Sequence, residues 1–209
     1  MHGICRIFGA GEPGGPSFVP QEADILIAAD GGYLRLRELG LMADVILGDF
    51  DSAPNPGQGI ALNPIKDETD MQAAVNYART LGCRRFHIYG GLGGRLSHTL
   101  ANIQMLAALS QVGCEVTLFG RNCTVTAITD GQMTFPAAQE GYLSVFAHSE
   151  CCTGVYESGL KYRLDDATLR NGFALGVSNE FIGENSCVGV KSGTLILMIE
   201  EKEKGTEES

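Results

Sequence analysis

The sequence contains no tryptophan and no apolar run of about 18 residues. The missing apolar run argues against a membrane-spanning helix, which needs about 20 such residues. The first residues, Met1 to Arg6, also lack the apolar stretch and the small-residue cleavage site of a secretory signal. We therefore expect a protein of the cytoplasm that has no membrane partner.

Positive charge and paired cysteines are also scarce. The chain has 15 Lys and Arg against 25 Asp and Glu, a net charge of −10, which argues against a nucleic-acid partner because phosphate binding needs basic surface. The seven cysteines are odd in number and form no C-x-x-C motif. They predict small buried residues rather than a disulfide framework. Cys151-Cys152 stays open as a redox or metal pair, although no second ligand pair accompanies it.

Glycine is in excess, at 28 of 209 residues. No Gly-X-Y period accompanies it, so a collagen-like chain is excluded. The glycines stand in short clusters beside apolar runs, as expected where the backbone is left-handed or approaches something closely. One cluster, residues 9–14, matches G-x-G-x-x-G, but Gly15-Pro16 and Pro20 follow and no helix opens. We therefore do not assign NAD or FAD binding to it.

Strand-like and helix-like segments alternate through about the first 120 residues. This alternation predicts an α/β domain with a mostly parallel sheet that is covered on both faces. The predicted strands are 4–8, 25–29, 45–47, 86–89 and 116–119, and the predicted helices are 34–39, 71–81 and 99–109.

The helix ends carry their own signals. Thr69 is placed as an N-cap, and Gln72 would complete a capping box with it. Gly40, Gly82 and Gly113 are placed to stop the three helices.

From Cys123 onward, short apolar segments between turn residues replace the alternating pattern, and no long helix is predicted. This favours an antiparallel β-sandwich or roll. We therefore predict an α/β domain at 1–125, an all-β sandwich at 126–200 and an acidic disordered tail at 201–209. The predicted segments centre on Val125, Met133, Leu143, Val155, Tyr162, Val188 and Leu195.

Acidic residues follow the predicted strands, where ligands bind in open α/β sheets. In the segment 48–52, Asp49 and Asp51 are two residues apart and can converge on one hard cation. Asp70, in the first turn of a predicted helix, can supply a third carboxylate. Magnesium prefers such oxygen ligands. The alternative interpretation is that these acids only form turns and helix caps.

The glycine-rich segment 90–94 joins a predicted strand to a predicted helix. Glycine there lets backbone N–H groups approach phosphate oxygens, and a helix start favours negative charge. Arg95 can clamp a phosphate with two donors, although the spacing is not that of a P-loop. His98 is either an acid–base group or a hydrogen-bonded residue of the helix start.

In the second half, Tyr162 could stack on a flat ring, and Ser178 and Asn179 could hydrogen-bond its edge. A core tyrosine and ordinary turn residues are the alternative.

Six segments occur in the order that is typical of the thiamine pyrophosphokinase (thiamine diphosphokinase) family, and from about Ile4 to Ile199 the sequence resembles that family. The segments are Ala29–Gly32, Gly48–Ser52, Lys66–Asp70, Gly93–Asn102, Gly159–Tyr162 and Val177–Phe181.

The resemblance implies an enzyme that transfers the diphosphoryl group of ATP to the hydroxyl of thiamine, giving thiamine diphosphate and AMP. It implies that residues 1–125 form a nucleotide-binding domain that binds ATP and carries the catalytic residues, and that the β-sandwich at 126–200 binds thiamine. It also implies a homodimer with active sites between the subunits. It also implies that Mg²⁺ is held by Asp49, Asp51 and Asp70, and that these acids and Arg95 form the catalytic set.

The same resemblance implies the substrate contacts. Tyr162 would stack on the thiamine pyrimidine, and Ser178 and Asn179 would bind that ring's polar edge. Lys66 and Arg95 would neutralise phosphate charge. The implied nucleotide-binding residues are Asp30, Gly31, Gly32, Lys66, Thr69, Gly90, Gly91, Gly94, Arg95, His98 and Asn102.

One departure from the family pattern motivates an alternative. Ser97 stands where the family carries Asp; it can cap the helix but brings no charge. A diphosphokinase of the same fold that acts on another hydroxymethyl heterocycle, such as a pterin, is therefore a second hypothesis. A nucleotide-binding protein without catalysis is a third, against which the retained acids and Arg95 count.

Overall fold

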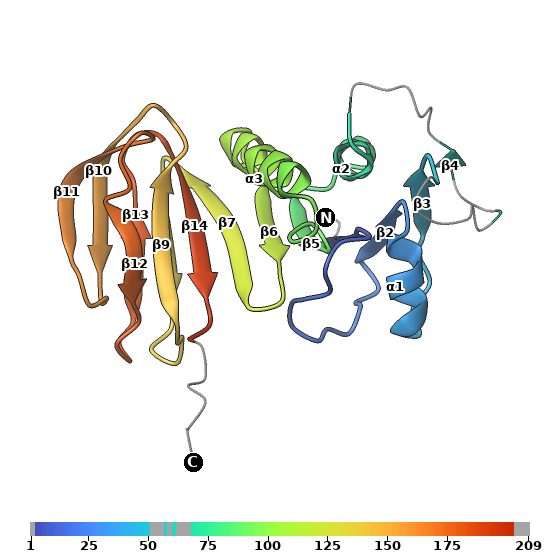
Figure 1. The fold of residues 1–209 in the computed structure, drawn as a ribbon, viewed down its shortest axis with the longest axis horizontal. Helices are drawn as coiled ribbons and strands as arrows, with labels where there is room; N and C mark the ends of the chain where they lie inside the picture. The colour runs from blue at the N-terminus through green and yellow to red at the C-terminus, as the bar shows by residue number, and fades with distance from the viewer. Residues whose placement is uncertain (1–2, 51–56, 58–59, 62–67, 203–209) are drawn as a thin grey trace, which may run out of the picture. The chain divides into compact units, whose positions relative to one another are not determined.

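The computed structural model describes residues 3–50, 57, 60–61 and 68–202 (Figure 1). The chain divides into two compact units, Met1–Arg121 and Asn122–Ser209, so the division falls after Arg121 rather than after residue 125. No helix among the described residues is long and apolar enough to cross a membrane.

The first unit contains a parallel sheet with the strand order β6-β5-β1-β2-β3-β4. Five strands lie where the apolar runs predict them. The sequence does not predict β4, because two residues are too few to show a period. The strands are β1 (Cys5–Phe8), β2 (Ile25–Ala29), β3 (Val45–Gly48), β4 (Ile60–Ala61), β5 (Arg85–Tyr89) and β6 (Glu115–Phe119).

Three helices accompany this sheet: α1 (Gly32–Glu38), α2 (Asp70–Thr80) and α3 (Leu96–Gln111), of which α2 and α3 pack against each other. α3 begins at Leu96 rather than Thr99. Leu96 and Leu100 are four residues apart, but both are exposed, so they do not belong to the buried face of this helix.

The cap of α2 is half as predicted. Thr69 Oγ1 accepts a hydrogen bond from the Gln72 N–H at 3.1 Å, which confirms the N-cap. The Gln72 side chain points along the helix and donates to Asn76 Oδ1 at 3.2 Å, so the reciprocal half of the capping box was wrong. The predicted helix stops are confirmed by positive φ angles at Gly40, Gly82 and Gly113.

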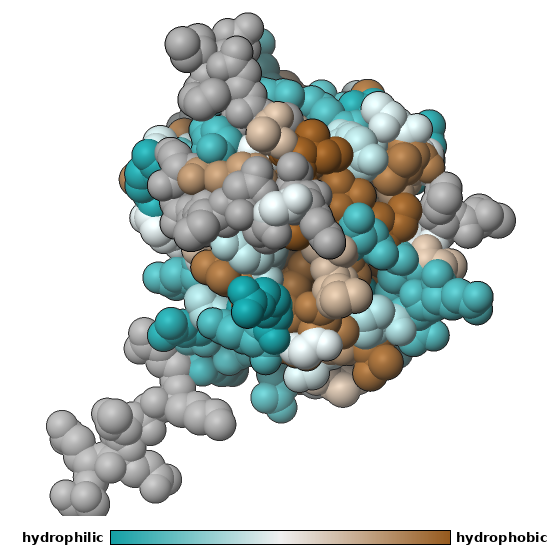
Figure 2. Space-filling view, turned by 90° about the vertical axis from the view of Figure 1, so that its right-hand side faces the viewer, coloured by the Kyte–Doolittle hydropathy of each residue, from teal (hydrophilic) through white to brown (hydrophobic). Residues whose placement is uncertain are grey.

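Both faces of the parallel sheet are covered. All four residues of β1 are buried, as are the last four of β2, which is the pattern of a strand with no solvent-facing side. Figure 2 views the end of this unit that carries α1, β3 and β4, where apolar side chains lie among hydrophilic ones on the surface. One core cluster contains Phe8, Leu26, Ala28, Tyr33, Leu36, Tyr89 and Phe119.

A buried cation lies inside this unit. Arg6 on β1 is 7% exposed and pairs with Asp24 at 3.1 Å. Its guanidinium also donates to Tyr89 Oη at 3.2 Å and lies 4.3 Å from the centre of the Phe18 ring. Burial opposes ionisation of Asp24, but hydrogen bonds from the Ile4 and Gln21 amides and from Arg6 outweigh it and lower its pKa.

The second unit is built from antiparallel strands, and it has no helix among its described residues. The strand orders are β12-β9-β14-β7 and β11-β10-β13-β8. The predicted change to antiparallel strands is therefore confirmed. The strands are β7 (Cys123–Thr129), β8 (Gln132–Phe135), β9 (Tyr142–Ala147), β10 (Cys151–Ser158), β11 (Leu164–Arg170), β12 (Gly176–Glu180), β13 (Ser186–Gly189) and β14 (Thr194–Glu200).

Apolar side chains from both sheets form one core in this unit. Leu143 on β9 and Leu195 on β14 meet Val155 on β10 and Val188 on β13, and all four are fully buried. Tyr162 differs from the prediction, because it lies in the turn between β10 and β11 rather than in a strand.

The two residues after β14, Glu201 and Lys202, make contacts with the second unit. The Glu201 N–H donates to Asn122 O at 2.9 Å, and Lys202 pairs with Glu180. Residues 201 and 202 are therefore held by the second unit, and residues 203–209 of the predicted tail lie outside the described part. All seven cysteines are free thiols; Cys152 is buried and donates to Thr194 O at 3.2 Å, so it acts as a core residue.

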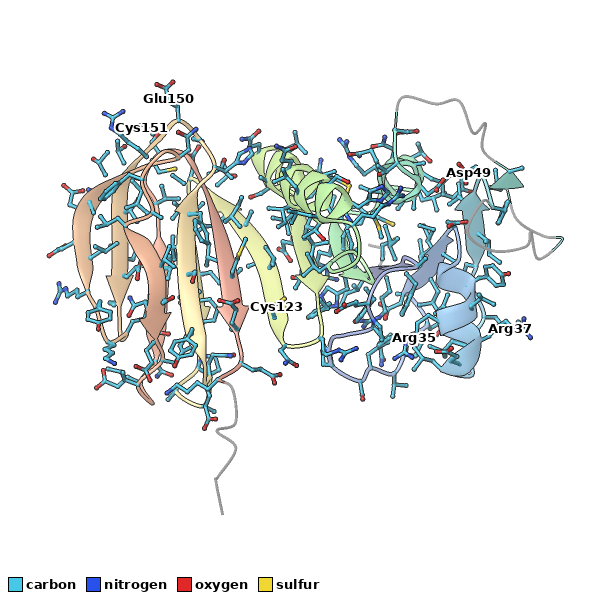
Figure 3. The ribbon with its side chains drawn as sticks, in the orientation of Figure 1. Arg35, Arg37, Asp49, Cys123, Glu150 and Cys151 are labelled. Carbon is cyan, nitrogen blue, oxygen red and sulfur yellow. The ribbon has the colours of Figure 1, made fainter. Side chains whose placement is uncertain are left out.

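We expect Arg6→Met to lower the free energy of unfolding by about 3 kcal/mol, because it leaves the buried Asp24 carboxylate without its cation. Arg37→Met is the matched control, since Arg37 is exposed on α1 and points away from the unit (Figure 3). Urea denaturation measures both variants. A loss at position 6 no larger than at position 37 would show that the buried pair is not needed.

Candidate active site

A cavity of about 350 Å³ lies in the first unit, at the carboxyl ends of its parallel strands. The walls come from the segments that follow β1, β2, β3 and β5 and from the first turns of α2 and α3. The lining residues are Gly9, Ala10, Gly11, Ala29, Asp30, Asp49, Glu68, Thr69, Asp70, Met71, Gly90, Gly91, Gly93, Gly94, Arg95, His98 and Asn102.

Three carboxylates predicted from sequence, Asp30, Asp49 and Asp70, line this one cavity. Figure 3 shows Asp49 at the end of β3. Asp30 is 7% exposed, has a φ of +50°, and its Oδ1 has no hydrogen-bond partner within the described part of the chain. A strained backbone and an unpaired buried oxygen are costly, and they typically mark functional positions.

The donor set of the cavity suits a hard cation, since these walls offer carboxylate oxygens and neither cysteine nor a pair of histidines. Among the described residues, no group of three acidic, histidine or cysteine side chains is close enough to hold a metal ion by itself. Magnesium usually takes one or two carboxylates and completes its shell with phosphate and water, so the set fits it in that way. Asp51 and Lys66 lie outside the described residues.

The glycine-rich segment after β5 is tied to α3. Asn102 is buried and donates from Nδ2 to Gly91 O at 2.7 Å, and Thr99 Oγ1 donates to Gly93 O at 3.1 Å. Asn102 therefore holds the segment in place, in addition to lining the cavity.

The start of α3 presents basic residues to the cavity. Arg95 is the N-cap residue and makes no side-chain cap bond, and both it and His98 are exposed and line the cavity. Ser97 is the second residue of α3, so the expected cap at Ser97 was wrong. Ser97 is exposed and does not line the cavity.

Residues 9–11, which the sequence pattern did not assign to a site, belong to this cavity. Their signal was their position directly after a predicted strand. The segment runs against the one after β5: Gly9 N–H donates to Tyr89 O at 2.8 Å, and Gly11 N–H to Gly90 O at 3.1 Å. A Cβ on Gly90 would lie 2.5 Å from Gly9 O, so the two backbones touch.

A second and larger cavity, about 760 Å³, shares residues 9–11 and Gly90 with the first. Its walls combine aromatic rings of the sheet with aliphatic side chains of α1. The lining residues are Phe8, Gly9, Ala10, Gly11, Pro13, Gly14, Gly15, Pro16, Ser17, Phe18, Gly31, Leu34, Arg35, Glu38, Leu39, Leu41, Tyr89 and Gly90.

The three residues predicted to bind thiamine differ in exposure: Tyr162 and Ser178 are exposed, whereas Asn179 is buried. The Tyr162 side chain is 61% exposed, so the alternative of a core tyrosine was wrong. Ser178 is exposed, has a φ of +57°, and its N–H donates to Ser144 Oγ at 3.0 Å. Asn179 is buried, and its side chain bonds to the backbone of Tyr162.

A buried carboxyl group that the sequence did not single out lies behind Asn179. Glu157 on β10 is 1% exposed and accepts from Asn179 Nδ2 at 2.5 Å. Burial raises the pKa of Glu157, and the hydrogen bond from Asn179 only partly opposes this. At the surface beside it, hydrogen bonds from Lys161 and Lys202 lower the pKa of Glu180 to about 2.

Comparison with known proteins places these two units. A family model described as thiamin pyrophosphokinase, catalytic domain, matches residues 19–118, and one described as thiamin pyrophosphokinase, vitamin B1 binding domain, matches residues 132–197. The chain belongs to the thiamin pyrophosphokinase family. The sequence-based prediction of this family is therefore confirmed. Most of the residues that line the first cavity lie in the range of the catalytic-domain model, and Tyr162 lies in the range of the B1-binding model.

This chain also matches individual members of the family along most of their length. The chain is 26% identical to a thiamine pyrophosphokinase of Bacillus subtilis over 187 residues, which covers 85% of this chain and 87% of the relative. The crystal structure of a thiamine pyrophosphokinase from Bacillus subtilis has a TM-score of 0.85 at 24% identity, with 96% and 100% of the two chains covered. One from Geobacillus thermodenitrificans has a TM-score of 0.82 at 26% identity, with 96% and 99% covered.

We expect Glu157→Gln to become more stable relative to the natural chain as pH rises. The folded state holds the Glu157 proton more tightly than the unfolded state, so raising the pH between its ordinary and its raised pKa costs stability that a neutral Gln does not lose. The urea midpoints of both chains at pH 5 and pH 8 measure this. Glu150→Gln, at an exposed position just before β10, should show no such widening, and a constant gap at position 157 would contradict the raised pKa.

Proposed function

We propose that this chain is a thiamine diphosphokinase, which transfers the diphosphoryl group of ATP to the hydroxyl of thiamine. The thiamine oxygen forms a bond to the β-phosphorus, and the bond between the β-phosphorus and the oxygen that bridges it to the α-phosphorus breaks. AMP leaves with that bridging oxygen, and the hydroxyl proton is released. The match of residues 132–197 to a vitamin B1 binding domain carries the proposal. It favours thiamine over a pterin or another hydroxymethyl heterocycle.

The acid- and glycine-lined cavity is the proposed site of the ATP phosphates. The glycine-rich segment after β5 lines this cavity and lets the backbone approach phosphate oxygens, and Arg95 at the start of α3 adds a cation. Such transfers depend on positioning and on charge neutralisation rather than on covalent help from the protein. No described residue is assigned as a general base.

Asp49, Asp51 and Asp70 are the proposed magnesium ligands, and the structure adds Asp30 as a candidate through its unpaired Oδ1. Magnesium, when bound, supplies charge neutralisation at the transferring phosphates. Lys66 would add a further cation. The roles of Asp51 and Lys66 rest on sequence, since both lie outside the described residues.

The larger cavity is the proposed site of the adenine base. Its aromatic and aliphatic walls suit a flat ring, and it meets the phosphate cavity along residues 9–11. A nucleotide could therefore cross this shared backbone with its base on one side and its phosphates on the other.

Tyr162 is the proposed stacking residue for the thiamine pyrimidine, which its exposure supports. Ser178 is exposed and can reach a ligand with its hydroxyl, whereas the buried Asn179 is better suited to hold Tyr162 than to touch thiamine. We further propose a cytoplasmic homodimer in which one subunit supplies the phosphate cavity and its partner supplies Tyr162.

Incubation of the full chain with ATP, magnesium and thiamine should yield AMP and thiamine diphosphate in equal amounts, measured by chromatography. ADP with thiamine monophosphate would contradict the transfer of a diphosphoryl group. Turnover of a hydroxymethylpterin without turnover of thiamine would select the alternative substrate.

Asp49→Asn should lower kcat by about 100-fold, because it removes a negative charge from the proposed metal site. Asp165→Asn is the matched control at an exposed position of β11, and its kcat should stay within about twofold of the natural chain. Steady-state rates at saturating ATP and magnesium measure both. Equal rates in the two variants would remove Asp49 from the site.

A further inference from the structure

The ring of Tyr162 is free of the core, but its backbone is clamped. The Tyr162 N–H donates to Asn179 Oδ1 at 2.9 Å, and Asn179 Nδ2 donates to Tyr162 O at 2.6 Å. One side-chain amide therefore holds both polar groups of this backbone residue. The neighbouring Lys161 N–H also bonds to Glu180 O at 3.0 Å, which ties the turn to β12.

The Asn179 amide has no bonding capacity left for a ligand. Its Oδ1 accepts from Tyr162 and from the Glu180 N–H at 2.9 Å, and its Nδ2 donates to Tyr162 and to Glu157. An asparagine amide offers two donors and two lone pairs, so all four are used. The amide also cannot rotate by half a turn without placing donors against donors.

Glu157 fixes that orientation from behind. It lies on the central strand β10, between Val188 of β13 and Leu164 of β11. Its Oε2 accepts from Asn179, while its Oε1 has no hydrogen-bond partner among the described residues. Gly176 leaves the space, since a Cβ there would lie 3.3 Å from Oε1.

A buried carboxyl group with a single bond is unfavourable for stability, and a core of this kind accepts an apolar residue more readily. Its presence therefore calls for a role other than packing. The group contacts Asn179, and Asn179 contacts the exposed Tyr162, so an effect at Glu157 can reach the ring through two side chains.

We infer that Glu157 is a positioning residue for thiamine, which holds the Asn179 amide so that Asn179 fixes the turn and the ring of Tyr162. The inference rests on the proposed function, in which this ring stacks on the pyrimidine. Glu157 touches no substrate itself and acts only through Asn179.

Three variants of the full chain test the role of Glu157 in steady-state kinetics. Glu157→Gln keeps an acceptor for Asn179 and should keep the KM for thiamine within about twofold. Glu157→Leu removes the acceptor, and Glu157→Asp withdraws it; each should raise that KM about tenfold. The KM for ATP and the kcat at saturating thiamine should stay within about twofold in all three. Glu150→Leu is the control at an exposed acid.

An unchanged thiamine KM in folded Glu157→Leu or Glu157→Asp would overturn the inference. So would a parallel rise in the KM values of thiamine and ATP, because that indicates general loss of structure. If Glu157→Leu does not fold, Glu157→Asp decides.

A fluorescent probe separates this inference from the proposed function. Because the chain has no tryptophan, Tyr162→Trp creates a single reporter at the turn. Adding Glu157→Leu or Glu157→Asp should lower the anisotropy of that reporter, while adding Glu157→Gln should not. Unchanged anisotropy in all three overturns the clamp whether or not thiamine turns over. Absence of thiamine turnover in the natural chain overturns the proposed function and, with it, the role in thiamine binding.

Discussion

Contact of backbone against backbone at the carboxyl end of the parallel sheet is the constraint on which the first unit depends. A Cβ on Gly32 would lie 1.8 Å from Phe8 O, and one on Gly90 would lie 2.5 Å from Gly9 O. The segments after β1, β2 and β5 therefore meet where no side chain fits. This closeness brings the acids of neighbouring strands to one cavity. It also gives a reason for several of the glycines that involves no ligand, because contact between neighbouring backbone segments leaves no room for a Cβ.

The second unit relies on a different device, a buried polar network inside an apolar sandwich. Glu157, Asn179 and the backbone of Tyr162 form a connected set in which the asparagine amide is fully bonded. Networks of this kind give one arrangement of side chains at some cost in stability. The result is an exposed aromatic ring on a rigid support. In the second unit, the exposed ring of Tyr162 is thus held by the buried side chains of Asn179 and Glu157.

Local sequence signals predicted most elements because they act within a few residues. Apolar runs indicated five of the six parallel strands, and Thr69 and the three glycine stops marked helix ends. The failures have physical causes. β4 is only two residues long, which is too short to show a period, and the first turn of α3 lies ahead of the buried residues of that helix. Gln72 bonds along its helix to Asn76, a choice between two local partners that spacing cannot decide.

The sequence by itself determined the family, the change from α/β to antiparallel β structure, and the acids and glycines at the strand ends, because each depends on short-range patterns. Tertiary structure alone decided that residues 9–11 line both cavities, that Tyr162 is exposed and that Asn179 faces inward. It also decided that Glu157 matters, since its partner Asn179 is 22 residues away along the chain. Hydrogen bonds between distant strands depend on register and burial, and these are set only when the sheets assemble.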